Sequence, residues 1–142
     1  MRETHGMLQG RRTWVFANKP AIRSTATVVG PDEGKGPLGN EFDIVHEDMW
    51  LGQKSWEKAE RMLLEEAAKL AIENGGVTKE QVQYFVGGDL MNQIISNTFA
   101  ARTLNIPYIG VFGACSTSML TLSLAALLVN SGAASLVLAG TC

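Results

Sequence analysis

The sequence is poor in the residues that build disulfide and metal sites. It holds two cysteines, at positions 115 and 142, and two histidines, His5 and His46, which lie far apart along its 142 residues. Their spacing fits neither a disulfide framework nor a metal-ligand motif. The net charge of −2 gives no electrostatic footprint for nucleic acid, which would need a basic patch or stripe. We therefore expect no zinc site and no nucleic-acid partner.

Charge is missing from the last part of the chain. All 26 charged residues, 12 basic and 14 acidic, lie between Arg2 and Arg102. The longest unbroken apolar stretch after them, Leu124–Val129, is far shorter than the ~20 residues of a membrane-spanning helix. We therefore expect a buried βαβ unit there and no transmembrane helix. Residues 1–8 lack the apolar core of a secretory signal, so no signal peptide is expected either.

The first forty residues contain short strand-forming runs and a loop. Strands are expected at 13–17 and 26–29. Residues 30–39 hold four glycines and two prolines, which is typical of a loop. This loop lacks the spacing of a phosphate-binding P-loop and the Lys-Ser/Thr pair at its end. We interpret it as an ordinary connection.

The segment Ser55–Asn74 is expected to form an amphipathic helix. Apolar residues recur there at steps of three or four, at Trp56, Ala59, Leu63, Ala67 and Leu70, and predict one buried stripe. Gly75 and Gly76 supply a C-terminal stop. The sequence Thr78–Gln81 matches a capping box, which predicts a short helical turn before the next strand.

From residue 82 onward the pattern alternates between strand and helix. Strands are expected at 82–86, 106–112 and 135–139, and helices at 92–104 and 116–130. The second helix is apolar on most faces, which indicates burial between layers. Such alternation predicts a parallel sheet with right-handed crossovers. Ligands bind such sheets beyond the carboxyl ends of the strands.

Two residues stand at such strand ends, and each has a plain structural alternative. Cys115 comes directly before a helix, where free amides and the helix dipole favour a thiolate or a bound anion. A lone cysteine there can equally be a small buried hydrophobic residue. Asp89 follows two glycines and could orient a ligand or bridge to a cation. It could equally cap the helix that begins near Asn92.

Several segments resemble known families. Gly113–Met119, between an apolar strand and an apolar helix, resembles the nucleophile segment of the thiolase superfamily. Four further segments resemble the stage V sporulation protein AD family within it: Trp14–Pro20, Val28–Gly39, Phe42–Asp48 and Gly87–Gln93. The resemblance implies an α/β thiolase-like fold, with a parallel-rich sheet, βαβ units and a buried central helix. It further implies a flexible N-terminus at 1–9 and a truncated N-terminal domain at 10–142, the first half of a two-half fold.

The resemblance also implies a function. Members of the sporulation family bind dipicolinic acid for its uptake into the developing spore and its release at germination. The matching acidic residue and cysteine, Asp89 and Cys115, would line the ligand pocket, with the amides after Cys115, beginning at Ser116, taking a carboxylate. The histidine and asparagine partners that condensing enzymes use come from the second half of the fold, which this chain lacks. A lapsed, non-catalytic scaffold is therefore the first interpretation.

Two other functions stay open. Cys115 could act as the nucleophile of an acyltransferase, through a thioester, or the chain could be a structural subunit that binds no ligand. Because dipicolinate is a dianion, Asp89 would need a cation such as Ca²⁺ between it and the ligand. The family role further implies partner subunits in a dipicolinate channel assembly. It also implies a peripheral position at the spore inner membrane, held through those partners, and a homodimer.

Overall fold

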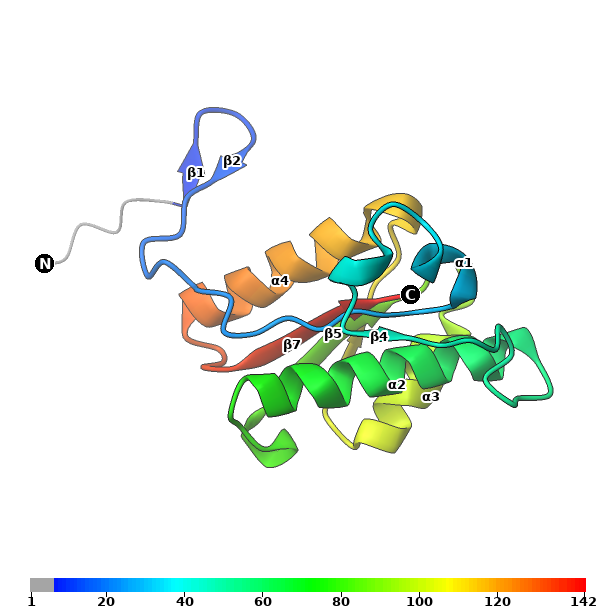
Figure 1. Ribbon diagram of the computed structural model, residues 1–142. Coiled ribbons are helices and arrows are strands. Elements are labelled where there is room, and N and C mark those ends of the chain that lie inside the picture. The colour runs from blue at the N-terminus through cyan, green and yellow to red at the C-terminus, as the bar shows by residue number, and fades with distance from the viewer. Residues whose placement is uncertain (1–6) are drawn as a thin grey trace, which may run out of the picture.

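A three-stranded parallel sheet organises the molecule. The computed structural model describes residues 7–142, and Figure 1 shows its layers. Strand β5 (Tyr84–Gly88) lies in the centre and pairs in parallel with β6 (Tyr108–Gly110) and β7 (Val137–Thr141). Helix α4 (Thr117–Ser131) packs on β5 and β7, while α2 (Trp56–Asn74) and α3 (Ile95–Leu104) pack together on the other face. The expected α/β class and parallel sheet are confirmed.

The N-terminal third contains only short elements, and the strands expected there are longer than those in the structure. They are strands β1 (Leu8–Gln9), β2 (Thr13–Trp14), β3 (Val28–Val29) and β4 (Ile44–Val45), helix α1 (Pro31–Gly34) and a 3-10 turn at Gly39–Glu41. Strands β1 and β2 form an antiparallel hairpin, and β3 and β4 pair in parallel. The hairpin starts inside the stretch that was expected to be flexible. Of that stretch, residues 1–6 lie outside the described part.

Helix α2 has the predicted ends but a different buried face. Ser55 caps it by accepting a hydrogen bond from the Lys58 amide at 3.4 Å, and Gly76 follows at a φ of 61°. Of the predicted stripe, only Ala59 is fully buried, and Trp56 is 51% exposed. The residues that face inward are Ala59, Leu64, Glu65, Ala68 and Ile72. The predicted stripe was therefore wrong by about one residue of rotation, because α2 faces α3 and the sheet together.

The main hydrophobic core lies between the sheet and the pair α2 and α3. Phe85 in the central strand is fully buried there and its ring lies 5.4 Å from that of Tyr108. Its buried neighbours are Leu64, Ala68, Ile72, Val82, Ala100, Ala101, Leu104 and Ile106. The predicted capping box at Thr78 is present and introduces a 3-10 turn, Lys79–Gln81, before β5. This core fixes the position of β5, the strand that directly precedes Asp89.

Helix α4 is buried on one side only. Thr117, Thr121 and Ala125 are its buried residues, whereas Met119 is 61% and Leu122 is 38% exposed. Its inward threonines are satisfied locally, since Thr121 Oγ1 donates to the Ser118 carbonyl at 2.9 Å. The expectation of burial on most faces is therefore wrong for residues 7–142. Within this part of the molecule α4 has a sheet beneath it and no second layer above it.

The apolar composition of α4 also resembles that of a membrane-spanning helix. The segment Ala114–Ser131 is long and apolar enough to cross a membrane, and it is the one such segment in the described part of the chain. A helix of a protein core has the same composition. Here the helix lies on β5 and β7 with its threonines turned to the sheet. This packing shows that the segment forms one of the layers of the α/β fold in this structure.

Candidate functional site

The ends of β5 and β6 lie together, as the sequence predicts. Asp89 follows β5, and Cys115 lies five residues after Gly110, the last residue of β6. Gly88 is packed so closely that a side chain on it would overlap the Val111 carbonyl oxygen and the Thr117 methyl group. The carboxyl end of the central strand therefore abuts the turn that carries Cys115.

The Cys115 turn is a strained 3-10 turn fixed by hydroxyl groups. It spans Ala114–Ser116, and Ala114 has a φ of 46°, a left-handed conformation that costs energy for a residue with a side chain. Ser116 Oγ donates to the Gly113 carbonyl at 2.7 Å. Thr117 Oγ1 donates to the Ala114 carbonyl at 2.7 Å and accepts from the Gly113 amide at 3.1 Å. These bonds hold the backbone in a conformation that leaves Cys115 exposed.

The sequence left open whether Cys115 is a reactive or anion-binding residue or a small buried hydrophobic one, and its exposure excludes the second interpretation. The side chain is not the small buried residue of the plain alternative. The amides after it are less free than expected, because Ser116 N–H donates to the Gly113 carbonyl at 3.0 Å and Thr117 N–H to the Ala114 carbonyl. An anion at this turn would therefore compete with internal hydrogen bonds for these two donors.

Asp89 caps helix α3, which is the structural alternative foreseen for it. Its side chain is 3% exposed, and its two oxygens accept from the amides of Ser96 and Asn97, each at 2.9 Å. Asn97 Nδ2 also donates to Oδ1. Because Ile94 at the helix start has a left-handed backbone and no capping side chain, Asp89 performs this function from outside the helix. Helix α3 consequently starts at Ile95 rather than at Asn92.

Sequence reasoning missed a polar cluster around Asp89. Cys142 Sγ lies 3.5 Å from Asp89 Oδ1 and 3.4 Å from Asn97 Nδ2. Ser96 Oγ donates to Glu60 Oε2 at 2.5 Å, which connects the cluster to α2. The signal that could have found Cys142 is its position at the carboxyl end of β7. That position indicates a place beside Asp89 only when β7 is known to pair with β5.

Two groups near this cluster are harder to ionise than usual. Burial raises the pKa of the Cys142 thiol well above its ordinary value, and the carboxylates of Glu60 and Asp89 raise it further. Burial also raises the pKa of Tyr108 to about 12, with the Asp89 charge acting in the same direction. Cys142 is therefore a neutral thiol at physiological pH, and it is no candidate nucleophile.

His46, the histidine within residues 7–142, is hydrogen-bonded to helix α2 and takes no part in the cluster around Asp89. His46 Nε2 lies 2.5 Å from Glu66 Oε2, so the histidine connects the loop after β4 to helix α2. No cluster of three or more histidine, cysteine or acidic side chains within residues 7–142 could hold a metal ion. A calcium ion at Asp89 would therefore need most of its oxygen ligands from outside the described residues.

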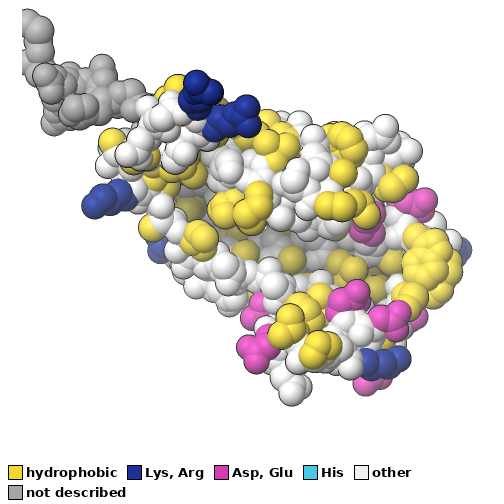
Figure 2. Space-filling model, turned by 90° about the horizontal axis from the view of Figure 1, so that it is seen from above, with side chains coloured by type: hydrophobic (Ala, Val, Ile, Leu, Met, Phe, Trp, Pro, Cys, Tyr) yellow, Lys and Arg dark blue, Asp and Glu magenta, His cyan; other side chains and the backbone are white. Residues whose placement is uncertain are grey.

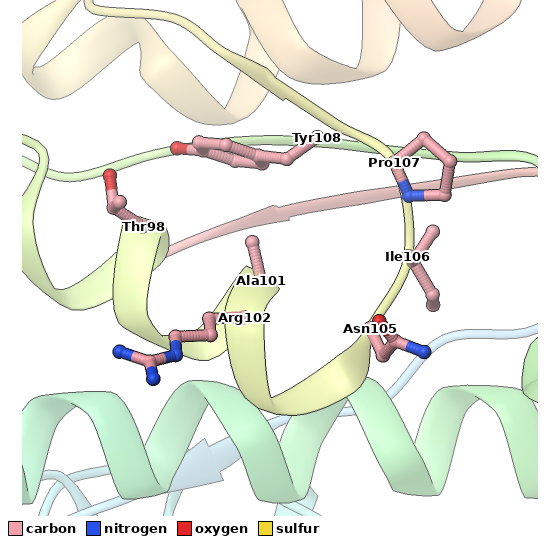
Figure 3. Close-up of a pocket in the computed structure, with 7 residues that line it drawn as sticks. All are labelled: Thr98, Ala101, Arg102, Asn105, Ile106, Pro107 and Tyr108. Carbon is pink, nitrogen blue, oxygen red and sulfur yellow. The ribbon is translucent and has the colours of Figure 1, made fainter.

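An open hollow of about 510 Å³ lies beside the edge strand β6 (Figure 3). Its lining residues are Thr98, Ala101, Arg102, Asn105, Ile106, Pro107 and Tyr108. The Tyr108 hydroxyl donates to the Gly87 carbonyl at 3.1 Å, so its proton is used within the fold. Neither Asp89 nor Cys115 lines this hollow, which is therefore separate from the strand-end site.

The fold and site define an α/β protein with an exposed cysteine on a strained turn beyond the carboxyl end of a strand in a parallel sheet. Residues 10–142 match the family model described as stage V sporulation protein AD. The chain is 44% identical to stage V sporulation protein AD of Bacillus subtilis (strain 168) over 134 residues, 94% of this chain. The chain belongs to the stage V sporulation protein AD family.

The match covers less of the relative than of the chain. The aligned residues span 40% of the length of the Bacillus subtilis protein. Among solved structures, the chain is similar to 3-oxoacyl-[acyl-carrier-protein] synthase III from Aquifex aeolicus VF5, with 18% identity and a TM-score of 0.45. That alignment covers 51% of this chain and 25% of the synthase.

Proposed function

We propose that this sporulation protein binds dipicolinic acid, for uptake into the developing spore and release at germination. The observation that carries the proposal is the Cys115 turn. It is strained at Ala114, exposes its cysteine and lies at the ligand-binding edge of the sheet. The chain also shares 44% of its residues with a stage V sporulation protein AD over the aligned region.

Cys115 and Ser116 are the proposed contact residues. Both side chains are exposed, and Ser116 Oγ, which donates its proton to the Gly113 carbonyl, would turn that proton to the ligand on binding. Dipicolinate is flat and carries two carboxylates, so hydroxyl, thiol and amide donors suit it. A donor that reaches a charged carboxylate contributes about 1.5 to 3 kcal/mol.

Asp89 is proposed as a positioning residue for this site. Its carboxylate fixes the start of α3, and its backbone directly follows Gly88, which is packed closely against Thr117, the residue after the Cys115 turn. Direct contact with dipicolinate through Ca²⁺ remains a second role for Asp89. In that role calcium would tighten binding, and Asp89→Asn would remove most of the calcium dependence.

The test is titration calorimetry of dipicolinate with a full-length family member that carries these segments. Cys115→Ala and Ser116→Ala should each weaken binding about tenfold or more, the equivalent of one lost hydrogen bond to a carboxylate. Ser118→Ala and Met119→Ala, in the first turn of α4 and also exposed, are the matched controls and should bind normally. Unchanged affinity in both site variants would remove the turn from the binding site.

The same titrations with calcium and with chelator test the role of Asp89. If Asp89 only positions α3, Asp89→Asn should lower stability and should not change the ratio of the affinities measured with and without calcium. If it coordinates a bridging ion, that ratio should fall toward one. Tighter binding of dipicolinate to Asp89→Asn in chelator would instead indicate direct repulsion between Asp89 and the ligand.

An acyltransferase that uses Cys115 is the second candidate function. The exposure of Cys115 on a strained turn favours it, since a nucleophile must be accessible. Against it, His46 is bonded to Glu66 and cannot serve as a free base. Stoichiometric acylation of Cys115 by an acyl-CoA, reversed by hydroxylamine, would establish this function. The dipicolinate proposal expects no such labelling.

The proposed assembly follows from the family role. We place the chain at the spore inner membrane as a peripheral component of a dipicolinate channel assembly, held through partner subunits. A homodimer is also proposed, supported by the free edge of β6, which pairs only with β5 within residues 7–142. An unpaired edge can accept another strand. Cross-linking in spore membranes tests the first proposal, and sedimentation of the purified protein tests the second.

A further inference from the structure

A basic arm projects from the molecule at its N-terminal end. The hairpin of β1 and β2 stands clear of the sheet and helices in Figure 1. Its base is anchored, because Asn18 N–H donates to Asn130 Oδ1 at 3.1 Å and Asn18 Nδ2 to the Asn130 carbonyl at 2.7 Å. We use the name basic arm for residues 7–23, which project at the hairpin and end on the body at Arg23, whose Nε donates to the Gly75 carbonyl at 2.6 Å.

One face of the hairpin is apolar and uncovered by the rest of the described chain. Leu8 and Trp14 are paired across the two strands, so their side chains lie on the same face. They are 59% and 47% exposed. Leu8 and Trp14 thus form a paired apolar surface on the hairpin that a partner can reach.

Charge is strongly segregated between the basic arm and the rest of the molecule. Residues 7–30 contain four basic residues, Arg11, Arg12, Lys19 and Arg23, and no acidic residue. Residues 31–90 contain 13 acidic and six basic residues. Figure 2 shows this tendency on one face, with Lys and Arg side chains beside the N-terminal end, and with most acidic side chains, together with some basic ones, towards the other end. Arg11 and Arg12 stand at the hairpin tip, next to the apolar face.

We propose that the basic arm binds the surface of an anionic lipid bilayer. Arginines at the tip would contact lipid phosphates, while Trp14 and Leu8 would enter the boundary between headgroups and acyl chains. Tryptophan suits this boundary because its ring is apolar and its N–H is polar. The acidic body would be repelled by the same surface, so the arm would be the part that approaches it.

This inference does not rest on the proposed dipicolinate site. It differs from attachment through partner proteins alone, because it gives the chain its own weak contact with lipid. Each basic residue at an anionic surface strengthens binding about fivefold, and salt screens the attraction. The contact should therefore be reversible and sensitive to ionic strength.

Binding of the 142-residue chain to lipid vesicles tests the inference first. Vesicles of phosphatidylglycerol and phosphatidylcholine should bind the chain, whereas phosphatidylcholine alone should bind it much more weakly. Arg11→Gln with Arg12→Gln should weaken binding to the anionic vesicles about 25-fold, as two lost basic contacts. Lys58→Gln with Lys69→Gln is the matched control, since both lysines are exposed on α2 in the acidic body. It should bind as the unaltered chain does.

Tryptophan fluorescence then locates the contact. The chain has three tryptophans, so Trp50→Phe with Trp56→Phe leaves Trp14 as the single reporter. Brominated phosphatidylglycerol should quench it. In Trp14→Phe, the remaining pair, stacked with centroids 3.9 Å apart, should be unaffected.

Three results would overturn the inference. The first is no binding to anionic vesicles at low salt. The second is equal quenching in the two tryptophan variants. The third is binding that survives the arginine substitutions but is lost with Met119→Gln and Leu122→Gln, which would assign the lipid contact to α4.

Discussion

At the scale of single residues, the two thiols of the chain lie in opposite environments. Cys115 is exposed on its turn, whereas Cys142 is partly buried against Asp89 and Asn97 and its pKa is raised. Because the thiolate is the reactive form, we expect iodoacetamide at mildly alkaline pH to modify Cys115 quickly and Cys142 only after unfolding. Mass spectrometry of timed samples measures this. Cys115→Ser should abolish the fast phase, and rapid modification of Cys142 would contradict the structure.

The raised pKa values also predict a loss of stability at alkaline pH. An unfolded chain ionises its cysteine near pH 9.0 and its tyrosine near 10.0, while the native state keeps both protons longer. The unfolded state then binds fewer protons, so the free energy of unfolding falls as the pH rises from 9.0 towards 12. Urea unfolding across this range should show the decline. Cys142→Ala should show a shallower decline, and an identical slope would exclude Cys142 as a cause.

Asp89→Asn should destabilise the chain more than a simple cap exchange. The carboxylate accepts from two amides with two different oxygens, whereas asparagine offers one acceptor and would direct its NH₂ group towards a donor. We expect a loss of about 1 to 3 kcal/mol, the cost of a buried unsatisfied group. Asp32→Asn, exposed in α1, is the control and should change stability by less than about 0.5 kcal/mol. Equal melting temperatures for the two variants would show that the Asp89 cap contributes little.

At the scale of elements, the sequence predicted where helices begin and end, but it did not predict correctly which of their faces are buried. The ends of α2 follow from Ser55 and the paired glycines, and the turn at Thr78 follows from its capping box, because each signal depends on neighbouring residues alone. The buried face of α2 depends on where α3 and the sheet lie, and periodicity does not contain that information. The apolarity of α4 likewise predicted burial without showing which layers are present to bury it.

Gly88→Ala tests the contact between β5 and the Cys115 turn. An added methyl group would overlap the Val111 carbonyl oxygen, a backbone atom that cannot move without shifting β6. Overpacking of this kind costs about 1 to 3 kcal/mol. Gly30→Ala is the control, since only the end of a flexible Glu33 side chain lies near its position, at 3.9 Å. Denaturant unfolding compares the two, and a Gly88→Ala chain as stable as the control would argue against the close packing.

At the scale of the whole molecule, the open face of α4 should govern self-association. Met119 and Leu122 are exposed on a helix with no layer above it in the described chain, and such surfaces promote association. We expect the purified chain to associate as its concentration rises, and Met119→Gln with Leu122→Gln to reduce this. Sedimentation velocity measures it, with exposed Leu38→Gln as control. A monomeric chain with a cooperative melt would contradict the expectation that this segment needs a covering partner.

Only part of the candidate site could be predicted from sequence, because the rest depends on how the strands are ordered in the sheet and on how the helices pack. Asp89 and Cys115 could be assigned to one edge because successive βα units place strand ends together. Cys142 could not be added, because its approach to Asp89 depends on the pairing of β7 with β5, and Glu60 could not be added, because its approach depends on the packing of α2 against α3. The sequence predicts the strands, but the order β6-β5-β7 is decided by packing across the complete sheet.

That strand order has a consequence for how the chain reaches its native state. Tyr84 pairs with Val137, so half of the sheet forms only after two residues far apart in sequence meet. Closing such a long loop costs entropy before any strand contact compensates for it, and folding rates fall as the sequence separation of contacts grows. We therefore expect the helices to appear early and the sheet late. In the interval β5 would be exposed, which makes refolding yield sensitive to protein concentration.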